Sequence, residues 1–492
     1  MTEVVPEVPA DDLTLAQLQD AMAAGRLSST GMVEAYLQRI QELDKQGPCL
    51  GAVLRLNEAA HETARALDLE RQAGQYRGIL HGIPVLLKGN INTGDSMPTT
   101  AGSLALAGFL PGRDAPLVAR LRQAGAVVLG KTNLSEWANF RSTLSSSGWS
   151  SEGGQTRNPY VLDRSPSGSS SGSAVAVAAN LSVLAVGTET DGSIISPASA
   201  NGIAGIKPGL GLVSAEGIIP ISHHQDTAGP LARNLADALQ LLLAMGNPGE
   251  LSASGLDRLM LPDAAGKRIG FAVKLAGFHP GVDALMNQAI RILEALGATV
   301  EESDLDCPDE LSEAEEIVLQ YDFRQDLEDY LLQWGPAGAI HSLDDIIVWN
   351  QANAAKAMPW FGQDILEACA HRAKPPGKEY AEALATCRRL SRDEGIDRVI
   401  RAGNLDAILA PSGGPAWKID LVTGDHFMGG SSSLPAVAGY PNLTIPAGFI
   451  HELPVGVSLF GPARSEARLV GIGLALEQAL KARRPPRFIH LA

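Results

Sequence analysis

Cysteine is scarce in this sequence of 492 residues. The four cysteines are Cys49, Cys307, Cys369 and Cys387, and no two of them form a CxxC pair. This spacing argues against a disulfide framework and against a structural zinc site. We therefore expect buried thiols and no bound metal.

Positive charge is also scarce. The chain has 39 Lys and Arg residues against 55 Asp and Glu residues, which gives a net charge of −16. This balance argues against electrostatic binding of nucleic acid or of an anionic membrane, and it favours solubility. We expect neither nucleic acid nor membrane as a partner.

Long hydrophobic runs are missing as well. The apolar runs are broken by glycine and polar residues and are too short to cross a bilayer. The first residues, MTEVVPEVPADD, lack the positive segment and apolar segment of a signal peptide and are expected to form a loose arm over 1–12. We expect a cytoplasmic location, although a removed or replaced leader would leave no trace.

Apolar residues are plentiful and patterned. They make up 45% of the chain, which indicates a soluble globular protein with a large core. Helical and strand patterns alternate, and this predicts an α/β fold with a parallel or mixed sheet. Helices are expected within 14–43 and at 54–70, 116–124, 174–179, 232–245, 282–296 and 467–481; strands at 79–87, 126–131, 183–187, 268–273, 298–302, 405–411, 442–446 and 454–460; a surface crossing at 247–265; and a mostly helical layer or lid at 309–400.

Hydroxyls and glycines gather between Ser165 and Pro208. A loop, SPSGSSSGS, is followed by small apolar residues and then by the turn Thr190-Asp191-Gly192-Ser193. Gly168 to Gly172 matches G-x-S-x-G, which would make Ser170 a nucleophile, but the apolar strand that should come directly before it is absent. The loop could also cradle an anion, although no phosphate-loop pattern is present, or serve as a linker, although tight apolar elements flank it.

Lys88 offers a further interpretation. It ends the apolar stretch IPVLL, and on local sequence alone it would extend its charge to solvent. A lysine acts as a base only when it is neutral, and burial can lower its pKa far enough. A neutral lysine could then accept a proton relayed between two serines, while consecutive backbone N–H groups around Gly192 stabilise an oxyanion.

These residues carry a resemblance to the amidase signature family. PSGSSSGS (166–173) and GTETDGSI (187–194) resemble its two central motifs, and the likeness extends across nearly the whole chain. The remaining segments are HGIPVLLKGNI (81–91), AGAVVLGKTNLSEWA (124–138), RNPY (157–160), GIAGIKP (202–208), QDTAGPLAR (225–233), LDAILAPS (405–412) and AGYPNLTIPAG (438–448).

The resemblance implies a Ser-cisSer-Lys triad. Ser193 corresponds to the nucleophile, Ser169 to the cis serine and Lys88 to the base. The backbone N–H groups of Thr190, Asp191, Gly192 and Ser193 correspond to the oxyanion hole. No metal or organic cofactor is implied.

The family also implies an architecture and a substrate class. We expect one α/β domain over 1–492, with a central mixed sheet covered by helices on both faces, a helical region at 1–75 and the layer 309–400 bordering the substrate cleft. The segments at 135–142, 147–160, 187–194 and 217–222 look closest to peptide amidases, which release ammonia from C-terminal carboxamides. We expect a small-molecule or peptide amide substrate and a monomer or homodimer.

Other roles within the family remain open. They are an aryl acylamidase, a fatty amide hydrolase, the amidase subunit of a tRNA-dependent amidotransferase and a non-catalytic binding protein. Two departures from the family pattern bear on the choice: Gly89 replaces a common aspartate after Lys88, and Ile195 replaces a common arginine. An apolar Ile195 cannot recognise a small anionic substrate and agrees with a neutral amide.

Two further features are interpreted as structural. Lys131 lies at a strand end in GKTN. The adjacent His223 and His224 would point to opposite faces of a strand, and no set of Asp, Glu or His with ligand spacing accompanies them. The sequence therefore predicts no metal site there.

Overall fold

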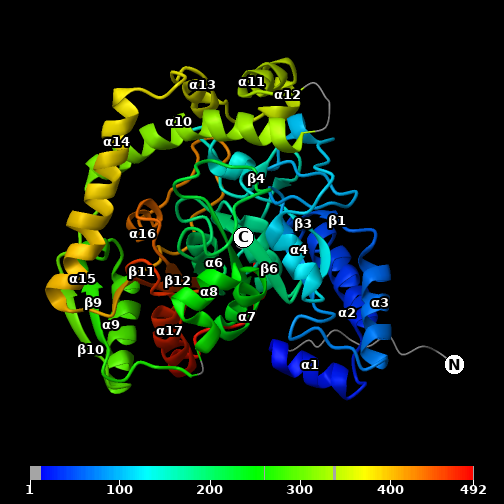
Figure 1. The fold of residues 1–492 in the computed structure, drawn as a ribbon, viewed down its shortest axis with the longest axis horizontal. Coiled ribbons are helices and arrows are strands. Elements are labelled where there is room, and N and C mark those ends of the chain that lie inside the picture. Colours follow the sequence, from blue (N-terminus) through cyan, green and yellow to red (C-terminus); the bar gives the residue numbers. More distant parts are fainter. Residues whose placement is uncertain (1–12, 260, 336–339, 491–492) are drawn as a thin grey trace.

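A mixed sheet of eleven strands runs through the molecule, in the order β1-β3-β2-β6-β8-β7-β12-β13-β11-β9-β10 (Figure 1). The computed structural model describes residues 13–259, 261–335 and 340–490, so the expected arm at 1–12 lies outside the described residues. The strands are β1 (Val53–Leu56), β2 (Pro84–Lys88), β3 (Val127–Thr132), β6 (Leu184–Glu189), β7 (Ala204–Lys207), β8 (Thr227–Ala232), β9 (Arg268–Ala272), β10 (Thr299–Ser303), β11 (Ala407–Pro411), β12 (Asn442–Ile450) and β13 (Leu453–Phe460), and a separate ribbon pairs β4 (Trp149–Ser150) with β5 (Gly154–Gln155).

Two groups of strands are parallel. Strand β2 pairs in parallel with β3 and β6, and β9 pairs in parallel with β10 and β11, while the other neighbours are antiparallel. Strands β2, β3, β6, β7, β8 and β11 are buried at every position. Strands covered on both faces have near-continuous apolar sequences, which explains why these strands could be recognised from the sequence.

Helices flank the sheet and confirm the predicted fold class. Helix α5 consists of small residues and is buried along its whole length, so it packs closely against β6. The helices are α1 (Leu15–Ala23), α2 (Ser29–Arg39), α3 (Ala60–Gln72), α4 (Pro116–Gln123), α5 (Ser171–Ala178), α6 (Ile195–Ala200), α7 (Leu235–Met245), α8 (Pro248–Ser254), α9 (Pro280–Ala295), α10 (Asp309–Trp334), α11 (Leu343–Ala352), α12 (Ala354–Ala357), α13 (Asp364–Ala370), α14 (Lys378–Arg388), α15 (Asp397–Gly403), α16 (Ser433–Val437) and α17 (Glu466–Leu480).

The segment 309–400 is mostly helical, as predicted. Helix α10 lies along the upper side of the view in Figure 1, and α14 runs down its left side. An apolar cluster ties α10 to the loops that follow β2 and β3, with Phe323 and Leu327 buried alongside Trp137. The ring of Trp137 meets that of Phe323 edge-on at 6.3 Å between centroids. This layer is therefore packed onto the sheet domain through its own core.

Three expectations were wrong in detail. The range 54–70 was expected as one helix, but β1 pairs with β3 at the edge of the sheet before α3 begins at Ala60. The range 247–265 was expected as a surface crossing, but it contains α8, which starts with Pro248 and buries Leu251. Not every thiol is buried, because Cys49 is exposed and Cys307 is partly so.

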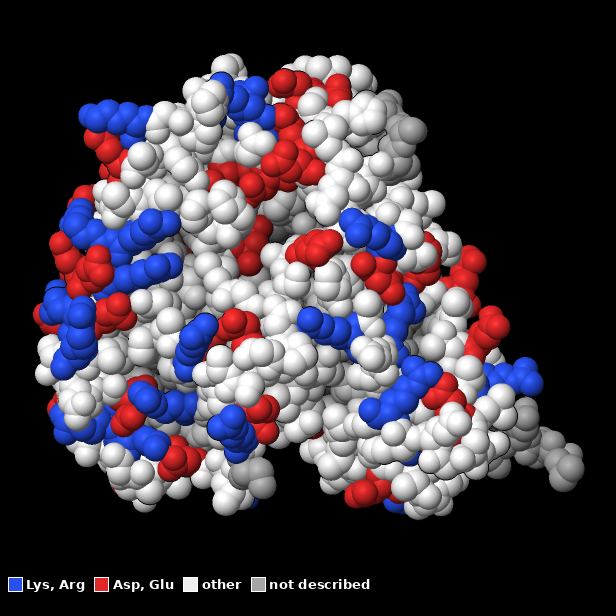
Figure 2. Space-filling view, viewed as in Figure 1, with Lys and Arg blue, Asp and Glu red and all other residues white. Residues whose placement is uncertain are grey.

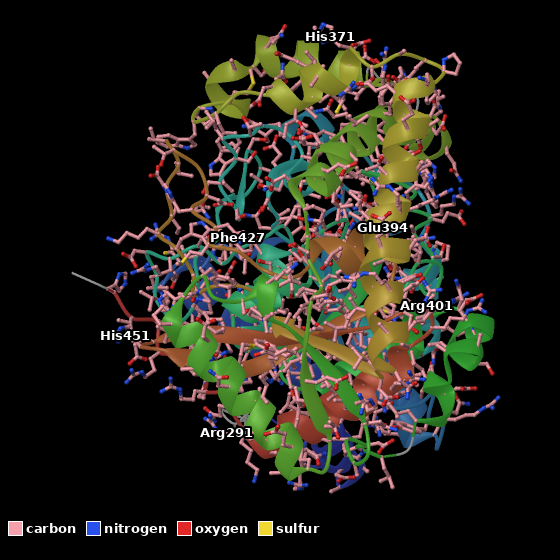
Figure 3. All side chains as sticks on the ribbon, turned by 90° about the vertical axis from the view of Figure 1, so that its left-hand side faces the viewer. Arg291, His371, Glu394, Arg401, Phe427 and His451 are labelled. Atoms are coloured by element: carbon pink, nitrogen blue, oxygen red, sulfur yellow. The ribbon has the colours of Figure 1, made fainter. Side chains whose placement is uncertain are left out.

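The surface shown in Figure 2 carries both signs of charge. Basic side chains lie among acidic ones, and the upper centre of this face is hollowed below α10, with acidic side chains around the hollow. Figure 3 shows Phe427 on the loop that precedes α16, on the opposite side of the view from Glu394 and Arg401. Among the described residues, no helix combines the length and the apolar character needed to cross a membrane.

Candidate active site

Lys88 ends β2, and its side chain is fully buried beside the end of β6. Its Nζ lies 2.8 Å from Ser169 Oγ, 2.8 Å from Thr188 Oγ1 and 3.1 Å from the Thr188 carbonyl oxygen. An ammonium group would donate to all three oxygens. A neutral amine would donate to the two oxygens of Thr188 and accept the hydroxyl proton of Ser169. The three contacts therefore suit both protonation states.

Burial lowers the pKa of Lys88 to about 7, although the negative charges of Asp226 and Glu189 oppose the shift. Desolvation penalises the charged form of a buried amine because water no longer solvates it. A lysine with such a pKa is close to half neutral at pH 7. It can therefore accept and return a proton near neutral pH.

The serine/glycine loop brings Ser169 to this lysine. The peptide bond between Gly168 and Ser169 is cis. The Ser169 carbonyl accepts the backbone N–H of Ser135 at 3.2 Å, and a Cβ at Gly168 would collide with Ser135 Oγ. The glycine is therefore needed for the close approach that positions Ser169.

Ser193 lies on the turn that follows β6. Its carbonyl accepts the backbone N–H of Ser170 at 3.1 Å, so the turn is joined to the loop that carries Ser169. Among the described residues, no hydrogen bond links Ser193 Oγ to Ser169 Oγ. The structure thus places Lys88 and Ser169 in direct contact and holds Ser193 on the adjoining turn.

The backbone of this turn offers consecutive donors. Within the described part of the chain, the N–H groups of residues 190–193 have no hydrogen-bond partner, whereas the next two, of Ile194 and Ile195, donate to the buried Glu189 carboxylate at 2.7 and 3.0 Å. Gly192 adopts a φ of +75°, which bends the chain so that successive N–H groups can converge. Such groups can stabilise the negative charge that develops on a carbonyl oxygen.

Side chains fix the turn at both ends. Thr190 Oγ1 donates to Asp226 at 2.6 Å, and Ser432 Oγ donates to Asp191 Oδ1 at 2.6 Å. Burial raises the pKa of Asp226 to about 6. The turn is therefore held by β8 on one side and by the segment before α16 on the other.

Replacing Gly192 with Ala is expected to lower kcat by about 100-fold, the size of effect seen when one oxyanion donor is lost. Any side chain at this φ is strained, and its Cβ would lie 2.8 Å from Ser432 Oγ. Gly25 gives a matched control, because its φ is +68° but nothing lies within 4 Å of the added Cβ. Equal kcat values for G192A and G25A in a steady-state amidase assay would refute this role of the turn.

Ser170 contributes to the structure of the loop. It is fully buried, and its Oγ donates to the Thr188 carbonyl at 3.0 Å and accepts the Thr188 N–H at 3.2 Å. No strand immediately precedes it, so the arrangement required for a G-x-S-x-G elbow is absent from the described loop.

Ser170→Ala is expected to keep substantial activity and to lower the free energy of unfolding by about 1–3 kcal/mol, because the buried Thr188 groups lose a partner. Chemical denaturation and steady-state kinetics measure the two effects. A loss of kcat as large as that of Ser193→Ala would instead identify Ser170 as the nucleophile.

Sequence reasoning missed several residues of the site. Thr188 binds Lys88, Asn90 Nδ2 donates to Thr188 Oγ1 at 3.0 Å, and Asp226 and Ser432 hold the turn. Thr188 and Asn90 lie within the motifs already noted, so their proximity to Lys88 could have been suspected. The contact of Ser432 joins segments far apart in the chain and left no local signal.

The two departures from the family pattern have structural explanations. At Gly89, a Cβ would lie 3.0 Å from Leu54 Cδ1 and 3.1 Å from Leu134 Cδ2, so the position faces a tight apolar contact. The Gly89 N–H donates to the Thr132 carbonyl at 3.0 Å, which keeps the backbone after Lys88 in order. Ile195 is fully buried at the start of α6.

Lys131 is buried as completely as Lys88 but has different partners. Its Nζ donates to Thr99 Oγ1 at 2.9 Å and to the Ile91 carbonyl, and burial lowers its pKa to about 7. Neither of its hydrogen-bond acceptors belongs to a serine. A depressed lysine pKa is therefore not by itself a mark of the site.

The expectation for His223 and His224 was wrong in its geometry. They lie on a turn rather than on a strand, and their rings are 4.0 Å apart between centroids. Both face aspartates of α10: His224 Nδ1 lies 2.9 Å from Asp322 Oδ2, and His223 Nδ1 lies 2.9 Å from Asp326 Oδ2. Local spacing could not reveal this set, because 98 residues separate His224 from Asp322.

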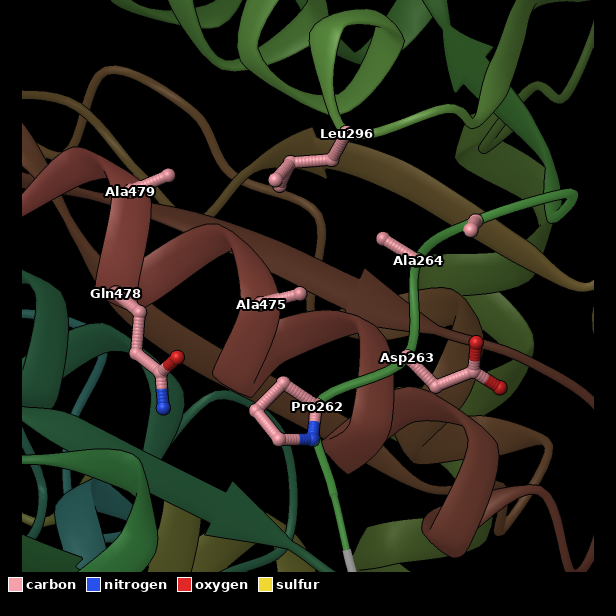
Figure 4. Close-up of a pocket in the computed structure, with 8 residues that line it drawn as sticks. Pro262, Asp263, Ala264, Leu296, Ala475, Gln478 and Ala479 are labelled. Atoms are coloured by element: carbon pink, nitrogen blue, oxygen red, sulfur yellow. The ribbon is translucent and has the colours of Figure 1, made fainter.

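A cavity of about 430 Å³ between α17 and the segment before β9 has a different character (Figure 4). Its lining includes Pro262, Leu296 and Ala475, and its acidic side chain, Asp263, forms an ion pair with Lys267 at 2.8 Å. Figure 4 shows no serine, lysine or histidine among the labelled side chains. The lining of this cavity therefore lacks the groups needed for hydrolysis by a serine nucleophile.

Comparisons with known proteins agree with this site. Residues 31–470 match the family model described as Amidase. The chain is 39% identical over 494 residues to a probable amidase of Arabidopsis thaliana, covering 97% of this chain and 92% of that protein. It is 34% identical to one chain of the glutamyl-tRNA(Gln) amidotransferase of Symbiobacterium thermophilum, covering 95% and 97%. The crystal structure of native peptide amidase from Stenotrophomonas maltophilia superposes with a TM-score of 0.90 at 48% identity, covering 98% and 99%.

Proposed function

This chain belongs to the amidase family and hydrolyses amide C–N bonds, and we propose that it does so with a Ser193–Ser169–Lys88 triad on the C-terminal carboxamides of peptides. The observation that carries the triad is the 2.8 Å contact between the buried Lys88 Nζ and Ser169 Oγ, beside a turn whose N–H groups lack partners among the described residues. The substrate class rests on the similarity to peptide amidase.

The first half of the reaction forms an acyl-enzyme. Ser193 Oγ attacks the amide carbonyl carbon, its proton moves to Ser169, and the proton of Ser169 moves to Lys88 Nζ. The carbonyl oxygen becomes an oxyanion, and the N–H groups of residues 190–193 donate to it. The C–N bond then breaks, and the protonated lysine returns a proton through Ser169 to the leaving nitrogen, which departs as ammonia.

The second half hydrolyses the ester. Water attacks the acyl carbon of Ser193, and its proton moves through Ser169 to Lys88. A second oxyanion forms against the same N–H groups. The C–Oγ bond breaks and Ser193 regains a proton by the reverse relay, so the enzyme is restored and the product is a carboxylic acid.

A neutral substrate with an apolar side chain fits the surroundings of the turn. Exposed apolar residues lie on two loops, with Leu144 on one and Phe427 and Met428 on the other. Asp425 joins these loops by accepting the backbone N–H of Ser147 at 3.0 Å. The second loop continues to Ser432, which binds the turn. An exposed apolar group near a reaction site favours binding of an apolar ligand surface.

The helical layer at 309–400 borders the substrate cleft in this proposal. Glu315 of α10 accepts Gln225 Nε2 at 2.7 Å, and the same amide donates to the Thr190 carbonyl at 3.3 Å. Arg141 is fully buried and donates to carbonyls of residues 357, 361 and 362. Both contacts bring the layer to the loops that surround the reacting groups.

An ammonia-release screen tests the substrate class. The purified chain is incubated with peptide amides, short aliphatic amides, free glutamine and anilides, and each product is quantified. Peptide amides are expected to give the highest kcat/KM, with one ammonia released for each carboxylic acid formed.

The other arms distinguish the alternatives. Aniline release at a higher kcat/KM would identify an aryl acylamidase, and a preference for long-chain amides would identify a fatty amide hydrolase. Ammonia release from glutamine that appears only with a co-purifying partner protein would identify an amidotransferase component. Each of these results would overturn the peptide amide proposal while leaving the triad intact.

A further inference from the structure

A second cluster of chemically active side chains lies between the turn 222–226 and α10. In the part of the chain that the structure describes, His223, His224 and Asp322 form the one group of three His, Cys, Asp or Glu residues whose possible ligand atoms all lie within 4.8 Å of one another. Asp326, one helical turn beyond Asp322, adds a second carboxylate, because its Oδ2 lies 2.9 Å from His223 Nδ1. The reaction proposed above uses none of these four side chains.

The separations suit a tetrahedral metal ion. Ligands bound to zinc at 2.0–2.2 Å are about 3.3–3.5 Å apart when the geometry is tetrahedral. His224 Nδ1 lies 2.9 Å from Asp322 Oδ2, and His223 Nδ1 lies 3.9 Å from Asp322 Oδ1. These distances lie on either side of the ideal value, so small side-chain rotations would bring the atoms into place.

Neighbouring groups hold the buried carboxylate in position. The side chain of Asp322 is only 2% exposed. Tyr380 donates its hydroxyl to Oδ1 at 2.7 Å, and Ser222 donates its hydroxyl to Oδ2 at 2.5 Å. Hydrogen bonds of this kind orient metal-binding carboxylates and strengthen binding.

The cluster also has an approach for an ion. His223 and His224 line a cavity of about 120 Å³, together with Cys387 and Arg388. A water molecule takes up about 30 Å³, so the cavity can admit an ion with part of its hydration shell. His223 is more than half exposed, which leaves its ring free to turn.

The donor chemistry selects one class of cation. Two imidazoles and two carboxylates match Zn²⁺ and similar transition metals, whereas Mg²⁺ and Ca²⁺ prefer oxygen ligands alone. With neutral imidazoles, the two carboxylates supply two negative charges to a divalent ion. Hydrogen bonds between the histidines and aspartates also explain the cluster without metal, and a metal titration distinguishes the two explanations.

We propose that His223, His224 and Asp322, with Asp326 as a fourth ligand, form a site for one Zn²⁺-class divalent cation. The two residues that follow bind Thr190: Gln225 donates to its carbonyl at 3.3 Å, and Asp226 accepts its hydroxyl at 2.6 Å. A bound cation would therefore fix the segment that supports the turn carrying Ser193. This second part rests on the proposed function, whereas the binding site itself does not.

Co²⁺ and Zn²⁺ titrations of the metal-stripped full chain test the site. Co²⁺ is followed by its visible d–d absorption, which is strong in tetrahedral sites, and Zn²⁺ by calorimetry. One ion per chain is expected, with a rise in the unfolding temperature. His223→Ala is expected to weaken binding by about tenfold or more.

His61→Ala is the matched control. His61 Nε2 lies 2.9 Å from Glu34 Oε1, so it forms an exposed His–carboxylate pair outside the cluster. Binding should be unchanged in H61A. The absence of saturable binding to the wild-type chain, or equal affinity of H223A and wild type, would overturn the site, whatever the ammonia assay shows. His224→Gln gives a second test if H223A is unstable.

Discussion

Ser193→Ala is expected to lower kcat for amide hydrolysis by about 10⁵-fold or more, as found when serine hydrolases lose their nucleophile. This corresponds to about 7 kcal/mol of transition-state stabilisation. Without Ser193 Oγ no acyl-enzyme can form, although the N–H groups of residues 190–193 and the relay remain. Ammonia release from the best peptide amide in the screen measures the loss.

The fold should survive this substitution. Ser193 Oγ makes no hydrogen bond to another described group, so its removal leaves no buried group unpaired. Far-ultraviolet circular dichroism and the denaturation midpoint check this point. A folded S193A that keeps a tenth of the wild-type kcat would exclude Ser193 as the nucleophile.

Lys88→Met is expected to lower kcat by about 1,000-fold or more, within the range attributed to general acid–base groups. The side chain keeps its length but cannot move a proton between Ser169 and the substrate. Lys131→Met is the matched control, because Lys131 is equally buried and has a similarly lowered pKa but binds other partners. Comparable losses of kcat in the two variants would contradict the role of Lys88.

Stability should change in the opposite direction to activity. Burial lowers the pKa of Lys88 in the folded state to about 7, below its unfolded value, so the folded chain binds fewer protons. The cost of burying this amine is therefore fully present below pH 7 and is relieved as the pH rises towards 10.5. Lys88→Met should gain most stability relative to wild type under acid conditions.

The same pKa sets the acid limb of the wild-type activity. Only neutral Lys88 can accept a proton, so kcat/KM should fall by about tenfold for each pH unit below 7. Asp226, whose pKa burial raises to about 6, should deepen the fall once its protonation loosens Thr190. A kcat/KM that is flat down to about pH 5 would argue against a lysine base.

Much of this arrangement could be predicted from the sequence. The buried strands β2, β3, β6 and β11 were recognisable because they are nearly continuous apolar runs. Lys88, Ser169 and Ser193 were identified by resemblance to a family. Composition and periodicity alone would have left Lys88 as a snorkelling side chain, because its burial depends on β2 lying between β3 and β6.

The parts that could not be predicted depend on contacts between distant segments. Edge strand β1 was taken for the start of a helix because its pairing with β3 has no local signature. The relation of His224 to Asp322 spans 98 residues, and that of Asp191 to Ser432 spans 241. Such pairs become visible only when the fold places their elements together.

Mapping the site of covalent modification tests the central claim most directly. The wild-type chain is treated with a fluorophosphonate, digested and analysed by tandem mass spectrometry. The account predicts one adduct per chain, on Ser193, and a much slower reaction in Lys88→Met than in Lys131→Met. An adduct on Ser170 or Ser169, or equal labelling of Ser193→Ala and wild type, would contradict it.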